Sequence, residues 1–104
     1  MMNELMKYGL AYYIVTTGRA CLTTLENNDI YTVLIDNSIL DIKGHILLEL
    51  VSKLKQQINL IFVNSRHDPN IESLVRQAGI VYYSTDMRDK QIVCVIRKLT
   101  TNNM

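Results

Sequence analysis

Hydrophobic positions along this chain follow two periods, which predict alternating strands and helices. Short runs rich in β-branched and aromatic residues predict strands over residues 10–16, 31–35, 59–63 and 80–83. Apolar residues spaced by three and four predict helices over residues 18–26, 44–56, 69–78 and 88–99. A strand–helix order repeated in this way is typical of a parallel sheet covered by helices on both faces. We therefore expect an α/β, doubly wound sandwich.

The helix predicted to begin near residue 69 has the clearest boundaries. Asp68 is a favoured capping residue, and Pro69 fits the first helical position, where no amide donor is needed. Gly79 stands where glycine commonly follows a helix end. In the other helices the predicted inward residues are Ala20, Leu22, Leu25, Leu47, Leu50, Val51, Leu54, Ile92, Val95, Ile96 and Leu99.

Composition indicates an ordinary globular domain. The 104 residues are enough for one domain, spanning 1–104, with 48% hydrophobic and 20% charged residues. The net charge of +1 and the scattered basic residues favour neither nucleic acid nor a membrane surface as a partner. No apolar run reaches membrane-spanning length, and the first residues do not resemble a signal peptide.

The two cysteines do not suggest a metal site. Cys21 and Cys94 lie far apart within apolar patterns, and neither forms a Cys-x-x-Cys pair. His45 and His67 have no ligand partners at zinc-site spacing, and we expect both to be surface residues. We expect both thiols to be packed and reduced, which suggests a cytoplasmic protein.

Candidate chemistry lies in the segment 36–44. Asp36 ends the predicted strand 31–35, and Gly44 opens the next predicted helix. In open α/β sheets, ligands and chemistry are found outside the carboxyl ends of the strands. Asp36 is therefore presented where a reactive carboxylate is expected.

These residues resemble the receiver domain of bacterial two-component response regulators, which has a flavodoxin-like fold. In that family a strand ends in the phosphoacceptor Asp and a Gly follows eight residues later, as Asp36 and Gly44 do here. Asn64 stands where a Ser or Thr usually contacts the phosphoryl group, and Ser65 is next to it. The segment 77–79 followed by Tyr83 is similar to the family's "AGA…Y" segment. The resemblance implies Asp36 as phosphoacceptor, Asn64 and Ser65 as phosphoryl contacts, and Tyr83 as the switch aromatic.

The chain departs from that family at its beginning. The family starts with a strand that carries two adjacent acids and then a full helix, whereas residues 1–8 are similar only to the tail of that helix. The expected fold therefore lacks the first strand and most of the first helix. The resemblance implies that those acids would complete a Mg²⁺ site. Mg²⁺ usually needs more than one anionic ligand, so Asp36 alone predicts a weak site, and Asp41 is misplaced to help.

A second departure follows Tyr83. The resemblance places a Lys where this chain has Asp86, and a Pro where it has Met87. A Lys there would neutralise the phosphoryl charge. Replacing that attraction by repulsion at about 6 Å is a change on the order of 5 kcal/mol, at an effective dielectric near 20. Arg66 and Arg88 are alternative cations, although neither is at the matching position.

Each candidate also has a purely structural interpretation. Asp36 can be a solvated loop carboxylate, and Asn64 and Ser65 can be turn-forming residues. Tyr83 can be a strand-end aromatic that packs on the last helix, and Asp86 can cap that helix.

The missing strand has a structural consequence. In the family's order it lies between the strands that match 10–16 and 31–35, so its loss leaves apolar edges that invite pairing. The strand at 10–16 can close directly against 31–35, or a second copy can cover the gap as a homodimer. The candidate contacts for a second copy are Tyr12, Tyr13 and Tyr31.

The sequence thus predicts a degenerate receiver-like domain in signal transduction. We expect it not to be an enzyme, to need no cofactor, and to act by contact with a protein partner or by self-association. The contact surface that the resemblance implies is residues 80–99, which are similar to the family's output and dimer face. The alternative is an active phosphorelay receiver that accepts phosphate on Asp36 with Mg²⁺. A small flavodoxin-like ligand binder is disfavoured because no strand–helix loop is Gly-rich enough to cradle phosphate.

Overall fold

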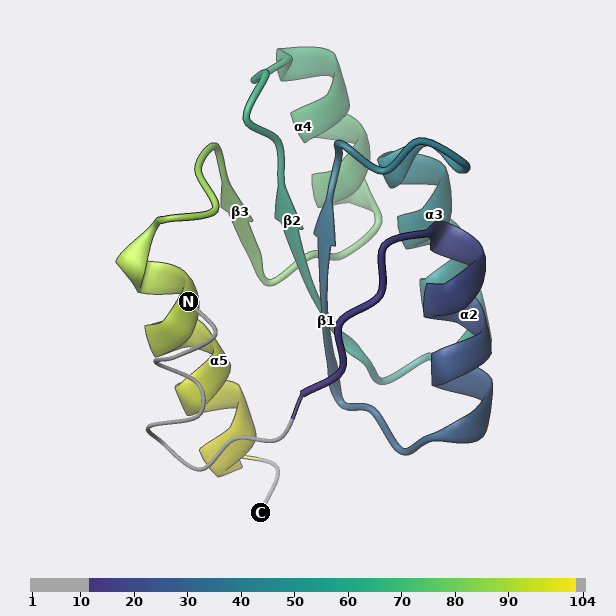
Figure 1. Ribbon diagram of the computed structural model, residues 1–104. Helices are drawn as coiled ribbons and strands as arrows, with labels where there is room; N and C mark the ends of the chain where they lie inside the picture. Colours follow the sequence, from purple (N-terminus) through teal and green to yellow (C-terminus); the bar gives the residue numbers. More distant parts are fainter. Residues whose placement is uncertain (1–11, 103–104) are drawn as a thin grey trace.

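The computed structural model describes residues 12–102, so the expectation for residues 1–8 lies outside them. Three strands and four helices follow each other along this part of the chain (Figure 1). They are α2 (Gly18–Asn27), β1 (Thr32–Asp36), α3 (Gly44–Leu54), β2 (Asn59–Val63), α4 (Pro69–Gln77), β3 (Tyr82–Ser84) and α5 (Lys90–Asn102).

The strands form one parallel sheet in the order β1-β2-β3. Helices α2, α3 and α4 lie to one side of the sheet and α5 lies to the other (Figure 1). The predicted fold class, a doubly wound parallel sheet with helices on both faces, is confirmed. Among the three described strands, β2 is the central one, with β1 on one side and β3 on the other.

The core forms around β2. Residues 60–63 are at most 3% exposed, as expected for a strand that is covered on both faces. Helix α3 buries Leu47, Leu48 and Val51 completely, whereas Leu50 and Leu54 are 40% and 41% exposed. The prediction that Leu50 and Leu54 face inward was therefore wrong. The three-to-four spacing fits two adjacent stripes of α3, and only packing selects between them.

The predicted boundaries of α4 are confirmed. The Asp68 carboxylate accepts a hydrogen bond from the Asn70 amide at 2.8 Å, and Pro69 opens the helix. Gly79 has a φ of 91°, a left-handed conformation that glycine adopts without strain. The start of α5 was predicted two residues too early. The Asp89 carboxylate accepts from the Gln91 amide at 2.9 Å, so Asp89 caps α5, and the prediction of Asp86 as the cap was wrong.

The strand predicted at 10–16 is absent over residues 12–16, while residues 10 and 11 lie outside the described part. Residues 12–16 form no helix or strand and precede α2 directly. Tyrosine and β-branched residues favour a strand only where a neighbouring strand supplies a ladder. No hydrogen bond between backbone groups joins residues 12–16 to β1. The predicted direct closure of 10–16 against 31–35 is thus not observed for these residues.

The cysteines differ from each other. Cys21 on α2 is buried, and burial raises the pKa of its thiol. Cys94 on α5 is exposed, so the expectation that both thiols are packed was wrong for Cys94. Both are free thiols.

Membrane insertion was not expected from the sequence. Between residues 12 and 102 there is no helix with the length and apolar character needed to cross a bilayer.

The two faces of α3 give a stability test. Leu47→Ala should lower the free energy of unfolding by about 2–5 kcal/mol because it opens a cavity at a fully buried site. Leu54→Ala makes the same substitution in the same helix at a site that is 41% exposed, and should cost roughly 1 kcal/mol or less. Urea denaturation measures both. Equal losses would contradict the assignment of the core face.

Candidate functional site

The carboxyl ends of the three strands meet at one edge of the sheet. The register pairs Asp36 with Val63 and Val63 with Ser84. The ladder continues one step further, because Asn37 N donates to Val63 O and Asn64 N donates to Ser84 O, both at 2.9 Å. The sheet therefore brings the ends of its three strands, with Asp36, Asn64 and Ser84, to the same edge.

Asp36 is partly exposed at the end of β1. Its carboxylate accepts a hydrogen bond from the Ser38 amide at 3.1 Å, and its carbonyl oxygen accepts from the Ile39 amide at 3.3 Å. These bonds form a side-chain turn of the kind that Asp makes with the backbone two residues on. One carboxylate oxygen thus orders the loop that follows β1.

Asn64 is only 3% exposed, and its side-chain oxygen is engaged by the protein itself. It accepts from the Arg66 amide at 3.2 Å and from the side-chain amide of Asn37 at 3.4 Å. Asn64 thus forms a local turn and ties the β1 and β2 ends together. Ser65 is exposed beside it.

Tyr83 lies in the middle of β3 and is held from the α4 side of the sheet. Its ring stacks on Phe62 with centroids 6.2 Å apart, and the Arg76 guanidinium lies 5.5 Å from the ring centroid. Its hydroxyl is 3.0 Å from Nδ1 of His67, while Nε2 of His67 is 3.6 Å from the Glu72 carboxylate. Burial, followed by the Glu72 charge, raises the pKa of Tyr83. Packing of Tyr83 on the last helix is thus not what the structure shows.

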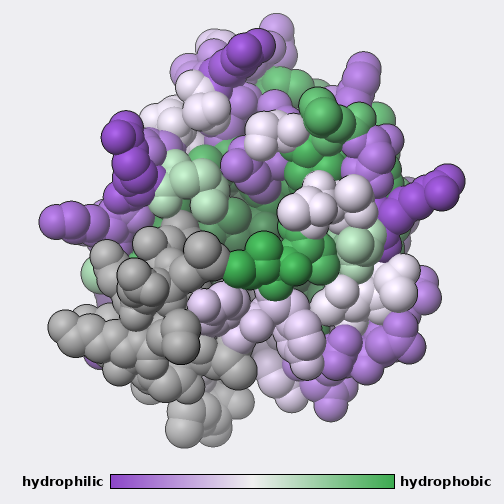
Figure 2. Space-filling view, in the orientation of Figure 1, coloured by the Kyte–Doolittle hydropathy of each residue, from purple (hydrophilic) through white to green (hydrophobic). Residues whose placement is uncertain are grey.

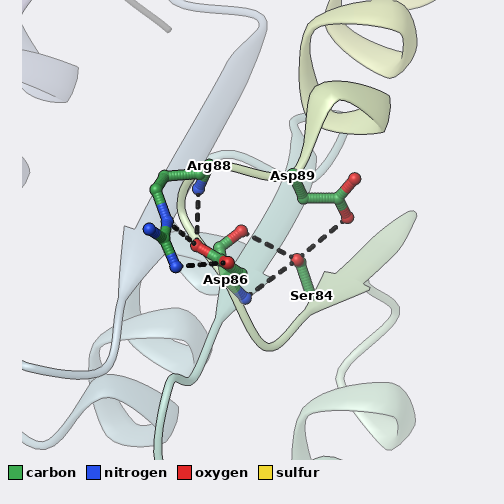
Figure 3. Close-up of polar contacts among 4 residues, drawn as sticks. All are labelled: Ser84, Asp86, Arg88 and Asp89. Carbon is green, nitrogen blue, oxygen red and sulfur yellow. Dashed lines mark hydrogen bonds and ion pairs between the residues drawn. The ribbon is translucent and has the colours of Figure 1, made fainter.

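Tyr82, the preceding residue, is the one that reaches toward α5. Its hydroxyl donates to the Asp89 carboxylate, and Ser84 Oγ donates to the same oxygen at 3.0 Å (Figure 3). The hydrogen bond from Tyr82 lowers the pKa of Asp89 and is the main cause of a raised pKa at Tyr82. Sequence reasoning missed this cluster. The sequence does contain a signal for it. Side chains alternate between the two faces of a strand, so Tyr82 and Ser84, two residues apart, are expected on the same face.

Asp86 is paired with a cation. The Arg88 guanidinium bonds both carboxylate oxygens, with Nε at 3.1 Å and Nη2 at 3.2 Å, and the Arg88 amide donates to Oδ1 at 2.8 Å (Figure 3). The side-chain bonds from Arg88 lower the pKa of Asp86. The pair is largely solvent-exposed, with 90% of the Arg88 side chain accessible. The expected change of about 5 kcal/mol, from attraction by a Lys to repulsion by Asp86, is therefore an overestimate, because it omitted this neutralising partner.

Asp41 has a structural role that ties the loop after β1 to α2. Its carboxylate accepts from the Gly18 amide at 2.8 Å and from the Arg19 amide at 3.1 Å. Amides at a helix start have no helical partner, and a carboxylate there is favourable. Bonds from these two amides lower the pKa of Asp41. This use of Asp41 agrees with the expectation that it does not serve the Asp36 site.

The described residues fit Mg²⁺ poorly. Across residues 12–102 no group of three His, Cys, Asp or Glu side chains is arranged to hold a metal ion. At the sheet edge Asp36 contributes one carboxylate, and its neighbours Asn64 and Ser84 are neutral. A hard divalent cation prefers several oxygen ligands with more than one negative charge.

Comparison with known proteins bears on the fold. No protein-family model matches the chain, and no curated protein matches it either. Solved structures do. A CheY-like response regulator receiver domain protein from Methanospirillum hungatei superposes with a TM-score of 0.85 at 24% identity, and the match covers 95% of this chain and 81% of that one.

Two further structures give the same result. The signal receiver domain of a putative Luxo repressor protein from Vibrio parahaemolyticus has a TM-score of 0.82 at 12% identity, covering 94% of this chain and 76% of that one. The beryllofluoride-activated NtrC4 receiver domain dimer has a TM-score of 0.82 at 10% identity, covering 96% and 84%. The chain thus has the receiver fold that the sequence resemblance implied.

Asp41 provides a pH test of the site's scaffold. Its folded-state pKa is lowered, so its contribution to stability is present above the unfolded pKa of about 3.9 and is lost as pH falls through the lower folded value. Asp41→Asn should lower the urea midpoint near neutral pH, and the difference from wild type should close as pH falls below about 4. Asp29→Asn, at an exposed position, serves as the control. A difference that does not change with pH would contradict the assignment.

Proposed function

We propose that this chain is a receiver-like signalling domain that acts by protein–protein contact and does not carry out efficient phosphotransfer. The main support is the set of polar residues that share the sheet edge with Asp36. At the same edge of the sheet, β2 and β3 end in a neutral amide and a hydroxyl, Asn64 and Ser84, and both are already bonded within the protein. A phosphoryl group on Asp36 would bring negative charge to an edge with little positive charge to stabilise it.

The charge arrangement after β3 supports the same proposal. Asp86 stands where the resemblance places a Lys, and Arg88 is committed to Asp86 by two side-chain bonds. Any use of Arg88 at Asp36 would have to break that pair and leave Asp86 as an unpaired negative charge. Phosphoryl transfer depends on charge stabilisation more than on any other contribution from the protein.

The proposed contact surface comprises residues 80–99, which cover β3 and most of α5. β3 is an edge strand of the sheet formed by residues 12–102, and within that range no strand lies on its outer side. Val81 is 47% exposed and Met87 is 37% exposed, and Cys94 is exposed on α5. Exposed apolar side chains beside an edge strand favour a protein partner over a small ligand.

A second copy of this chain is one proposed partner, and the cytoplasm is the proposed location. Two free thiols, one of them exposed, are typical of a reducing compartment. The proposal includes neither nucleic acid nor a membrane surface as partner, since the net charge is only +1.

The second candidate is an active phosphoacceptor, and one observation favours it. Asp36 is partly exposed at the carboxyl end of β1, and a single turn bond is the only hydrogen bond of its carboxylate to the described residues. Under this alternative Asp36 would accept the phosphoryl group and would supply an oxygen ligand to Mg²⁺, with Asn64 and Ser65 as phosphoryl contacts and Tyr83 as the switch aromatic.

Intact-mass measurement separates the two candidates. The chain is incubated with Mg²⁺ and acetyl phosphate, and we expect no stoichiometric gain of a phosphoryl group, because the site lacks the charges that stabilise it. Asp36→Asn is the matched control, since it keeps the shape of the side chain and can still accept the Ser38 bond. Stoichiometric phosphorylation of the wild-type chain that disappears in Asp36→Asn would establish the alternative.

A further inference from the structure

Strand β1 has one paired edge and one edge to which the described residues add no strand. Toward β2, Tyr31 O accepts from Asn59 N at 2.8 Å, and Asn37 N donates to Val63 O at 2.9 Å. Peptide groups of successive strand residues point alternately to the two sides, so the odd-numbered residues face β2. The backbone groups of Thr32, Leu34 and Asp36 therefore face the other edge. Such an edge is a template for another strand.

Residues 12–16 favour a strand by their sequence, but they form no backbone hydrogen bonds with a neighbouring strand among the described residues. Their sequence is Tyr-Tyr-Ile-Val-Thr, which contains no charge and consists of strong strand formers. The side chains of residues 12–15 are 37%, 62%, 62% and 39% exposed. The Tyr13 hydroxyl donates a hydrogen bond to the Asn28 side chain at 3.0 Å. Local preference and observed conformation thus disagree over five consecutive residues.

Both features are seen from the same side of the molecule. In Figure 1 the trace of residues 12–17 passes in front of part of β1 and then turns toward α2, and Figure 2 shows hydrophobic surface near the centre of the same view. Tyr31, which directly precedes β1, is also 62% exposed. A run of large apolar side chains next to an open strand edge is the arrangement that soluble monomers avoid.

The end of the segment is attached to the loop after β1. Asp41 holds the amides of Gly18 and Arg19, immediately after the segment. With its end held there, the described backbone of the segment makes no hydrogen bond to β1. The same bonds hold the segment in a second copy, but they do not fix where that copy lies relative to β1 of the first.

We propose that the free edge of β1 pairs with residues 12–16 of a second copy, in a reciprocal exchange that forms a two-fold dimer. The inference rests on the proposed function in its choice of a second copy as partner. In a two-fold interface each copy supplies both the edge and the strand, so both unpaired elements of both chains are satisfied at once. The added strand carries no charge that would be buried on the apolar edge.

The size of the contact sets the expected strength. Two five-residue strand pairings, with the apolar side chains of residues 12–15 and Tyr31 covered in each copy, would bury roughly 1,200 Å² in total, near the lower end for stable interfaces. Association in the micromolar range is therefore expected.

Sedimentation velocity across the micromolar range tests the proposal. The wild-type chain should shift from monomer to dimer as concentration rises. Ile14→Lys combined with Val15→Lys should abolish the dimer, because two charges would be placed at the pairing. Leu74→Lys is the matched control, since Leu74 is 47% exposed but lies on α4, outside both proposed contact surfaces. A single-chain mass at every concentration, or a dimer lost in Leu74→Lys but kept in the double variant, would overturn the proposal.

Disulfide trapping identifies the contact directly. In a Cys94→Ala background, one variant carries Ile14→Cys and the other carries Leu34→Cys, and the two are mixed and oxidised. A disulfide between the two variants is expected, and a mixture of Ile14→Cys with Leu74→Cys should give none, because Leu74 lies on α4 outside the proposed pairing. Circular dichroism checks that each variant is folded. The phosphorylation measurement with Asp36→Asn is independent of these results, so the proposed function and the strand exchange can fail separately.

Discussion

The pairing of β2 with a strand on each side is the constraint on which the rest of this structure depends. β2 is almost inaccessible from residue 60 to residue 63, and its register fixes the positions of both neighbours. The hydrophobic burial of Phe62 and its neighbours holds the helices on both faces. The same register places Asp36, Asn64 and Ser84 at one edge. Core packing and the geometry of the candidate site are therefore two consequences of a single ladder, and a slip of one residue would change both.

Much of the fold was predictable because it depends on local chemistry. The capping pair Asp68 and Pro69 identified α4 correctly, and the apolar run at 59–63 identified β2 to the residue. The strand at 12–16 failed for the opposite reason. Tyrosine, isoleucine and valine report a preference for pleated structure, but a strand exists only when another strand supplies its hydrogen bonds. Whether a partner strand is present depends on the tertiary structure, which a local sequence pattern does not specify.

The candidate site was likewise predictable only in part. The position of Asp36 at the end of β1 followed from its place after an apolar run. The partners of the other residues did not, because they come from side chains that only the fold brings together. Arg88 neutralises Asp86, and Tyr82 and Ser84 share the Asp89 carboxylate. Counting charges along the sequence predicted repulsion near the site. The structure replaces that repulsion with an exposed ion pair, whose net effect on stability is small.

The hydrogen bonding of the carboxyl edge and the exposure of the β1 edge both bear on the proposed function. Asn64 and Ser84 at the carboxyl edge are already bonded to other groups of the protein, so the edge offers little to an incoming phosphoryl group. At the outer edge of β1, by contrast, the described residues supply no strand, and the side chains of residues 12–15 are 37–62% exposed. Unsatisfied strand edges and exposed apolar surface are the features that drive association. The distribution of unmet interactions therefore favours a domain that works through contact with another chain over one that works through chemistry at Asp36.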